Sequence, residues 1–180
     1  MQAVLFSIRP EHCEKIATGD KCIELRKAAP HIPTPFQSFI YCTMGRTLYR
    51  SNHDGMIRIY HKQALEAAFA HHTVFNGKVI GEFTCDWIEA YEPCDWGRAA
   101  TWACVSMDDI HKYMDGHLLV HGLHISELKI YDSPRSLSEF RLWNGCRNCK
   151  SEGSYHCVQY CAGRRLERPP QSWCYVEVPE

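Results

Sequence analysis

The sequence predicts an α+β fold in which short strands form a small mixed β-barrel flanked by two or three helices. Short apolar runs of strand type recur along the chain, and few segments have helical spacing. The earliest apolar run can pair with late ones, as a barrel requires. The chain has 180 residues, of which 45% are hydrophobic. This is enough to bury a core in one domain, or in one domain with an appendage.

The N-terminal elements are predicted by local patterns. Residues 3–8 form an apolar run that predicts a buried strand. Residues 10–18 predict a short helix, because proline suits its first position and Gly19 offers a stop. Residues 21–26 then extend as a strand, in which Glu24 and Arg26 share one face.

The middle of the chain alternates between strands and less regular sequence. Residues 39–42 predict a core strand, and residues 44–76 read as an insertion that contains a helix over 62–72. Residues 78–88 predict a long strand with apolar side chains on both faces, as in a barrel. Asn76 and Gly77 form the turn that leads into it.

The C-terminal half contains three further predicted elements and a last strand. Ser106 is a typical N-cap, so a helix is expected over residues 107–114. Residues 118–131 are strand-like, with Gly122 as a bulge. One helical turn is expected over 137–140. These elements are followed by a cysteine cluster, and residues 173–178 alternate as a final strand.

The charge and hydropathy of the chain limit its partners. The net charge is −1, so no global basic signal for nucleic acid is present. No basic leader precedes an apolar run at the N-terminus, and no apolar run approaches the ~18 residues that a bilayer span needs. We therefore expect a soluble cytoplasmic protein without a membrane partner.

Lys21, Glu24 and Arg26 bring a cation, a carboxylate and a guanidinium together, with Lys21 at the turn before the strand. Such a group can hold a phosphate and a base edge at once. The alternative interpretation is a surface strand with a salt bridge.

The pattern Gly19-x-Lys21-x-x-Glu24-x-Arg26, placed after the helix over 10–18, resembles the signature of ASCH domains, which are small relatives of the PUA domain. The segments 7–10, 77–83 and 169–173 are similar to those of the larger microbial and phage members. The resemblance covers most of the chain. It implies a single PUA-like β-barrel domain over residues 1–180, with flanking helices and an insertion at about 44–76.

The resemblance also implies that the chain binds RNA or a nucleotide-like ligand in a cleft around the signature. Pro169 and Pro170 stiffen the approach to a polar rim, in which Gln171, Ser172 and Trp173 offer amide, hydroxyl and indole donors. For Trp173, stacking on a base competes with packing in the barrel. The candidate binding residues are Ser7, Arg9, Lys21, Glu24, Arg26, Gln171, Ser172 and Trp173.

A hydrolase acting on modified nucleosides or RNA is the alternative function, with Lys21, Glu24 and Glu82 as candidate catalytic residues. Acetylcytidine amidohydrolases with this domain are similar in having the lysine, a hydroxyl residue three places later and an acid on a later strand. Here Lys21 matches, and Glu82 supplies the acid, but position 24 is glutamate. Thr43 or Ser172 can replace the missing nucleophile if the fold brings either beside Lys21. A third alternative is a phage or host interaction protein.

A cysteine cluster occupies the loop at about 141–168 and predicts a structural zinc site. Two close pairs of cysteines, seven residues apart, can surround one tetrahedral ion. His156 is an alternative ligand, and disulfides or a metal-free flexible loop are alternative interpretations. Because protein ligands fill all four positions, the zinc is expected to stabilise the loop and not to catalyse. The predicted ligands are Cys146, Cys149, Cys157 and Cys161.

Overall fold

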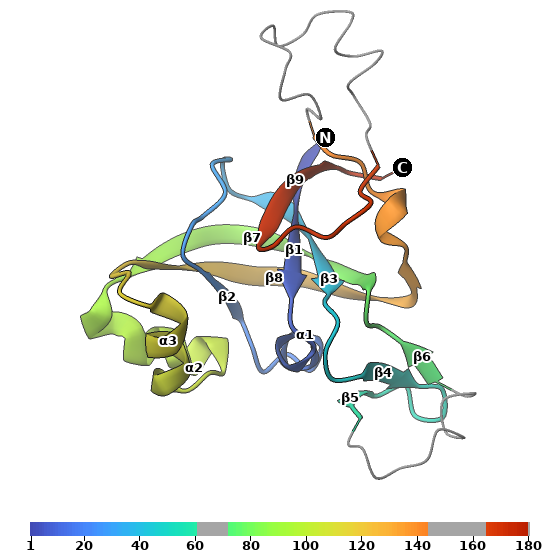
Figure 1. Ribbon diagram of the computed structural model, residues 1–180, viewed down its shortest axis with the longest axis horizontal. Helices are drawn as coiled ribbons and strands as arrows, with labels where there is room; N and C mark the ends of the chain where they lie inside the picture. Colours follow the sequence, from blue (N-terminus) through green and yellow to red (C-terminus); the bar gives the residue numbers. More distant parts are fainter. Residues whose placement is uncertain (61–71, 144–164, 180) are drawn as a thin grey trace, which may run out of the picture.

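The computed structural model describes residues 1–60, 72–143 and 165–179. Its centre is a mixed six-stranded sheet with the order β2-β8-β7-β3-β1-β9 (Figure 1). These strands are β1 (Gln2–Ile8), β2 (Ile23–Arg26), β3 (Phe36–Cys42), β7 (Lys78–Tyr91), β8 (Val120–Arg135) and β9 (Trp173–Glu177). In the described part of the chain, no helix is long and apolar enough to cross a membrane.

Strand β1 lies inside the sheet, parallel to β3 and antiparallel to β9. The predicted pairing of an early strand with a late one is therefore confirmed. Its apolar run is buried because each face meets a different core: Phe6 belongs to one cluster and Leu5 to the other. The backbone N–H of Val178 donates to the carbonyl oxygen of Met1 at 3.0 Å, so the start of β1 lies beside the end of β9.

The sheet is not closed into the predicted barrel. Its edges are β2 and β9, and among the described residues no backbone ladder joins them. Side chains link the edges instead. Arg26 Nη1 donates to the carbonyl oxygen of Ser172 at 3.3 Å, and Trp173 Nε1 donates to the carbonyl oxygen of Ala28 at 3.0 Å. Pro169 and Pro170, just before β9, have no N–H with which to continue a ladder.

Strands β7 and β8 are long and bend, because their pairing shifts register at several points. The bulge predicted at Gly122 lies elsewhere, since Gly122 pairs regularly with Glu89. This glycine has another role. A Cβ at this position would lie 2.7 Å from Tyr91 Cε2, so its absence allows the tyrosine ring to pack against β8.

In the described part of the chain, three helices flank the large sheet: α1 (Pro10–Ala17), α2 (Trp96–Ala103) and α3 (Met107–Met114). The sequence predicts α1 and α3, and Ser106 caps α3 as expected by accepting from the Asp109 N–H. Helix α2 is not predicted. It and α3 share a buried apolar cluster with the start of β2, the end of β7 and the start of β8.

A second sheet, formed by β4 (Leu48–Ser51), β5 (Ile57–Ile59) and β6 (His72–Val74), occupies the predicted insertion. The helix predicted over 62–72 lies outside the described residues except for His72, which begins β6. A 3₁₀ turn at Leu137–Glu139 (η3) matches the predicted helical turn, and a second such turn is Pro93–Asp95 (η2). Helix α1 lies between the α2–α3 pair and the small sheet (Figure 1).

Candidate functional site

A cavity of about 780 Å³ lies between the end of β1, α1, β2 and α3. It collects six of the eight predicted binding residues. Those that line it are Ser7, Arg9, Lys21, Glu24, Arg26 and Gln171. Ser172 and Trp173 adjoin this group without lining the cavity.

One wall of the cavity contains a buried ion triad. Glu24 Oε2 lies 3.3 Å from Lys21 Nζ, and Glu24 Oε1 lies 2.8 Å from Arg26 Nη2. The side chains of Lys21, Glu24 and Arg26 are 2%, 7% and 9% exposed. Strand alternation puts Glu24 and Arg26 on one face, and Lys21 reaches them from the preceding turn. The triad carries a net positive charge.

The electrostatics of the triad keep Glu24 ionised. Burial alone would raise the pKa of this carboxyl group, but the neighbouring charges of Lys21 and Arg26 outweigh that effect and hold the pKa below its usual range. Lys21 Nζ also donates to the carbonyl oxygen of Ala103 at 3.2 Å. The acceptors around Lys21 therefore suit a charged ammonium group.

The guanidinium of Arg26 is occupied by its own chain. Nη2 donates to the carbonyl oxygen of Ser7 at 2.9 Å, and Nη1 donates to both the Oγ and the carbonyl oxygen of Ser172, at 3.2 and 3.3 Å. The group also lies 5.4 Å from the centre of the Phe6 ring. Arg26 thus fixes the cavity wall and is not free to bind a ligand in this arrangement.

Ser7 holds the C-terminal segment against the cavity. Its Oγ donates to the carbonyl oxygen of Pro170 at 2.6 Å, and its N–H donates to that of Ser172 at 2.9 Å. These bonds position Gln171 at the cavity. Trp173 packs edge-on against Tyr175 with a centroid distance of 5.3 Å. Of the two roles considered for this indole, the structure therefore shows packing.

The structure does not bring Glu82 to the cavity. This residue lies on β7, where its Oε2 accepts from Gln37 Nε2 at 3.1 Å and from the Tyr131 hydroxyl at 2.7 Å. The predicted set of Lys21, Glu24 and Glu82 is therefore divided, because in the sheet β8 lies between β7 and β2, and β3 lies between β7 and β1. Of the two hydroxyl residues considered as replacement nucleophiles, Thr43 lines the cavity, whereas the Ser172 hydroxyl accepts a hydrogen bond from Arg26.

Several cavity residues were not predicted, and they come from α1 and α3. They are Glu11, His12, Lys15, Asp109, Lys112 and Tyr113. Helical spacing would have put Asp109, Lys112 and Tyr113 on one face of α3. Nothing in the sequence indicates that this face lies opposite α1.

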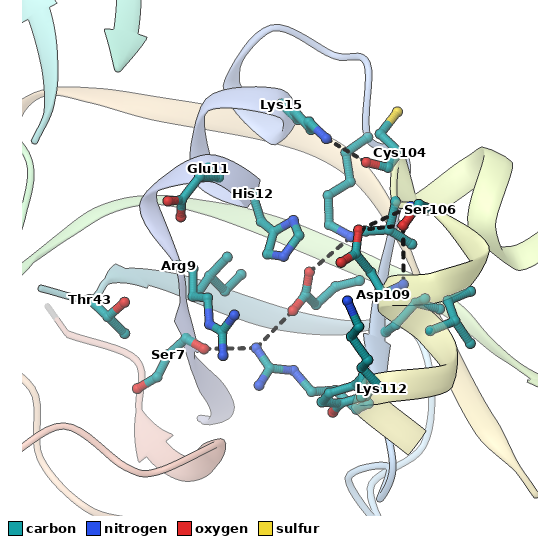
Figure 2. Close-up of a pocket in the computed structure, with 18 of the residues that line it drawn as sticks. Ser7, Arg9, Glu11, His12, Lys15, Thr43, Cys104, Ser106, Asp109 and Lys112 are labelled. Carbon is teal, nitrogen blue, oxygen red and sulfur yellow. Dashed lines mark hydrogen bonds and ion pairs between the residues drawn. The ribbon is translucent and has the colours of Figure 1, made fainter. Parts of the chain in front are cut away.

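His12 points into the cavity in Figure 2. Burial lowers the pKa of its imidazole, and the charge of Lys21 lowers it further, so the ring is neutral at pH 7. Its Nδ1 is buried and forms no hydrogen bond with the residues that the structure describes. A neutral imidazole can both donate and accept hydrogen bonds.

The other charged groups of the cavity differ in whether they have partners. Glu11 faces Arg46 at 3.9 Å, and Asp109 accepts from the Ser106 hydroxyl at 2.7 Å. Lys15 Nζ donates to the carbonyl oxygen of Cys104. The side chains of Arg9 and Lys112 are exposed and form no hydrogen bond or ion pair within the described ranges. In Figure 2 both side chains extend into the cavity. The acids thus have partners, whereas these two cations do not.

The predicted zinc ligands lie outside the described residues. These ligands are Cys146, Cys149, Cys157 and Cys161, and the alternative ligand His156 also lies outside the described residues. Elsewhere, in the ranges that the structure does describe, no group of three or more metal-binding side chains comes together.

Comparison with known proteins identifies the fold. No protein-family model and no curated protein sequence matches the chain. Among solved structures, the ASCH protein of Zymomonas mobilis aligns with a TM-score of 0.52 at 17% identity, covering 75% of this chain and 73% of that one. A tyrosine-to-phenylalanine mutant of the same protein aligns with the same TM-score at 16% identity, covering 75% of this chain and 76% of that one. These alignments show that the two proteins share a fold.

Proposed function

We propose that this chain, which has the fold of ASCH domains, binds RNA or a nucleotide-like ligand in the cavity between α1, β2 and α3. One observation carries the proposal: Arg9 and Lys112 face the cavity without partners, whereas Glu11 and Asp109 are engaged. A cavity whose lining contains two unpartnered cations and more Lys and Arg than Asp and Glu side chains attracts an anion. A phosphate of a nucleotide is such an anion, and hydrogen bonds from charged donors would hold it.

Other side chains of the cavity suit a planar group with polar edges, such as the base of a nucleotide. The neutral imidazole of His12, the ring of Tyr113 and the exposed amide of Gln171 all line it. Amide and imidazole groups can bind the edges of a base, and aromatic rings can stack on its face. These three residues are our candidates for base recognition.

The same contacts weigh against the hydrolase alternative. Attack on a carbonyl or phosphate requires a nucleophile and a base that activates it. Lys21 Nζ lies 3.3 Å from Glu24 Oε2 and donates to the carbonyl oxygen of Ala103, and the hydroxyl of Ser7 already donates to Pro170. A role in recognition therefore fits these groups better than a role in proton transfer.

We also propose that the cysteine cluster holds a structural zinc ion. The chain leaves and re-enters the described part of the fold at one place, because the Leu166 N–H donates to the carbonyl oxygen of Phe140 at 2.9 Å and Arg141 forms a bridge with Arg165. A segment whose ends are joined in this way can be stabilised by one local cross-link, and a four-cysteine zinc site supplies it.

The binding proposal can be tested by calorimetric titration with ribonucleoside monophosphates and with a short single-stranded RNA. A Gln171→Trp variant should fill the cavity and weaken binding by about tenfold or more, without a large change in thermal unfolding, because Gln171 is exposed. The control variant is Lys78→Trp, at an exposed position at the start of β7. Equal affinity of Gln171→Trp and the wild-type protein would place the ligand elsewhere.

A further inference from the structure

The two unpartnered cations of the cavity come from different helices. Arg9 is the N-cap residue of α1, and Lys112 lies near the end of α3. Figure 2 shows their charged ends directed into the cavity from opposite walls. Burial raises the pKa of Tyr113 on α3, while the charge of Arg26 and, to a smaller extent, that of Arg9 lower it.

Nearby groups strengthen the positive potential between these two residues. The ion triad behind Arg9 contains two cations and one carboxylate. The N-terminus of α1, which has no side-chain cap, contributes a partial positive charge at the same place. Together these features favour a compact group of high negative charge between the walls.

We propose that Arg9 and Lys112 form a clamp for the terminal phosphate of a mononucleotide. This inference rests on the proposed function and specifies its ligand. A terminal phosphate monoester carries a charge of about −2 near neutral pH, so it can satisfy two cations that approach it from different sides. A phosphodiester within a strand carries one charge and must continue out of the cavity in two directions.

Cavity size and overall charge favour a mononucleotide over an RNA strand. A volume of about 780 Å³ is within the usual range for a small ligand. Binding of a polyanion depends on many phosphate contacts along a basic track. This chain has a net charge of −1, and Glu11 and Asp109 lie in the cavity walls next to the two cations.

The experiment compares pairs of ligands on the intact protein. Calorimetry is performed with ribonucleoside monophosphates, the matching nucleosides, inorganic phosphate, and a short RNA that lacks terminal phosphates. Each is titrated into the wild-type protein and into the Arg9→Ala, Lys112→Ala and Lys78→Ala variants. Lys78 is the matched control because it is exposed and does not line the cavity.

We expect at least one monophosphate to bind about tenfold or more tightly than its nucleoside. Arg9→Ala and Lys112→Ala should each remove most of that difference and leave nucleoside binding unchanged, whereas Lys78→Ala should have no effect. All three positions are exposed, so thermal unfolding should be nearly unchanged.

The contrary outcomes separate the clamp from the proposed function. Equal affinity for a nucleoside and its monophosphate would overturn the clamp while the binding function stands. Tighter binding of the RNA without terminal phosphates than of any monophosphate would overturn the terminal-phosphate assignment and favour an RNA ligand. Binding of inorganic phosphate as tight as that of the monophosphates would show an anion site without base recognition. No binding of any nucleotide, nucleoside or RNA would overturn the function itself.

Discussion

A Glu24→Gln variant should unfold at a much lower urea concentration than the wild-type protein. Glutamine nearly preserves the shape of the side chain but removes the negative charge between Lys21 and Arg26. The two cations are 2% and 9% exposed in their side chains, so water cannot replace the lost carboxylate. Both would remain buried as like charges without compensation.

The expected size of this effect follows from the burial of the triad. Breaking a buried ion pair by removing one partner costs about 3–5 kcal/mol. With a urea dependence of about 2 kcal/mol/M for a small domain, the midpoint should fall by roughly 2 M. The matched control is Glu11→Gln. Glu11 is 40% exposed in its side chain, and its pairing with Arg46 at 3.9 Å is worth at most about 1 kcal/mol.

Acid should reveal the same interaction. The pKa of Glu24 is lowered in the folded protein from its ordinary value of 4.5. The stability contributed by the ionised carboxylate is therefore complete above pH 4.5 and is lost as the pH falls through the lower pKa of the folded state. The wild-type protein should lose stability in this range more steeply than Glu24→Gln, which has no group to protonate at this position.

A Lys21→Met/Glu24→Gln double variant keeps the test decisive if the single variant does not fold. It removes one of the two uncompensated cations and should recover part of the lost stability. The reasoning would be refuted if Glu24→Gln cost less than about 1 kcal/mol and behaved like Glu11→Gln. The triad would then be a hydrated surface network and not a buried one.

Three further predictions concern other parts of the chain. Protein purified without added metal should contain about one equivalent of zinc by elemental analysis, and Cys149→Ser should lose it; less than about a tenth of an equivalent in reduced protein would exclude the site. Deacetylation of acetylcytidine should be slow or absent, because Glu24 stands where the amidohydrolases have a hydroxyl nucleophile and is held between Lys21 and Arg26. Turnover that is lost in Lys21→Ala but kept in Glu24→Ala would reverse this conclusion. Gly122→Ala should lower the free energy of unfolding in urea by about 1–3 kcal/mol, because the new methyl group would lie 2.7 Å from Tyr91 Cε2. An unchanged urea midpoint would show that the Tyr91 ring can move away from the methyl group.

Local patterns in the sequence were sufficient to predict β1, α1, α3 and the strand that carries the signature. In each case the signal lies within a few residues: a proline at the first helical position, a serine cap, or an apolar run. The association of Lys21, Glu24 and Arg26 was also predictable, because it depends on strand alternation and one turn. Helix α2 was missed because it lacks such local signals: its N-cap residue, Asp95, forms no side-chain cap, and its first turn contains no acidic residue.

The composition of the cavity was less predictable, because it depends on contacts between distant segments. The α3 wall is positioned by a cluster that joins α2, α3 and three strands, and no local pattern contains that information. The lack of a backbone ladder between the edge strands β2 and β9, among the described residues, has a similar cause. Whether a curved sheet closes depends on the register and donors at its two edges. Here Pro169 and Pro170 offer no donor before β9, and the edges are joined by a contact between Arg26 and Ser172, which are 146 residues apart in the chain.

The contact between Arg26 and Ser172 also determines when the cavity can form during protein synthesis. The chain emerges from the ribosome N-terminus first, so β1, α1 and the signature strand are available long before Ser172 is made. Until then the guanidinium of Arg26 lacks two of its acceptors, and Gln171 is absent from the wall. The cavity is therefore one of the last parts of the domain to be completed, and a nascent chain halted within the cysteine-rich segment cannot assemble it.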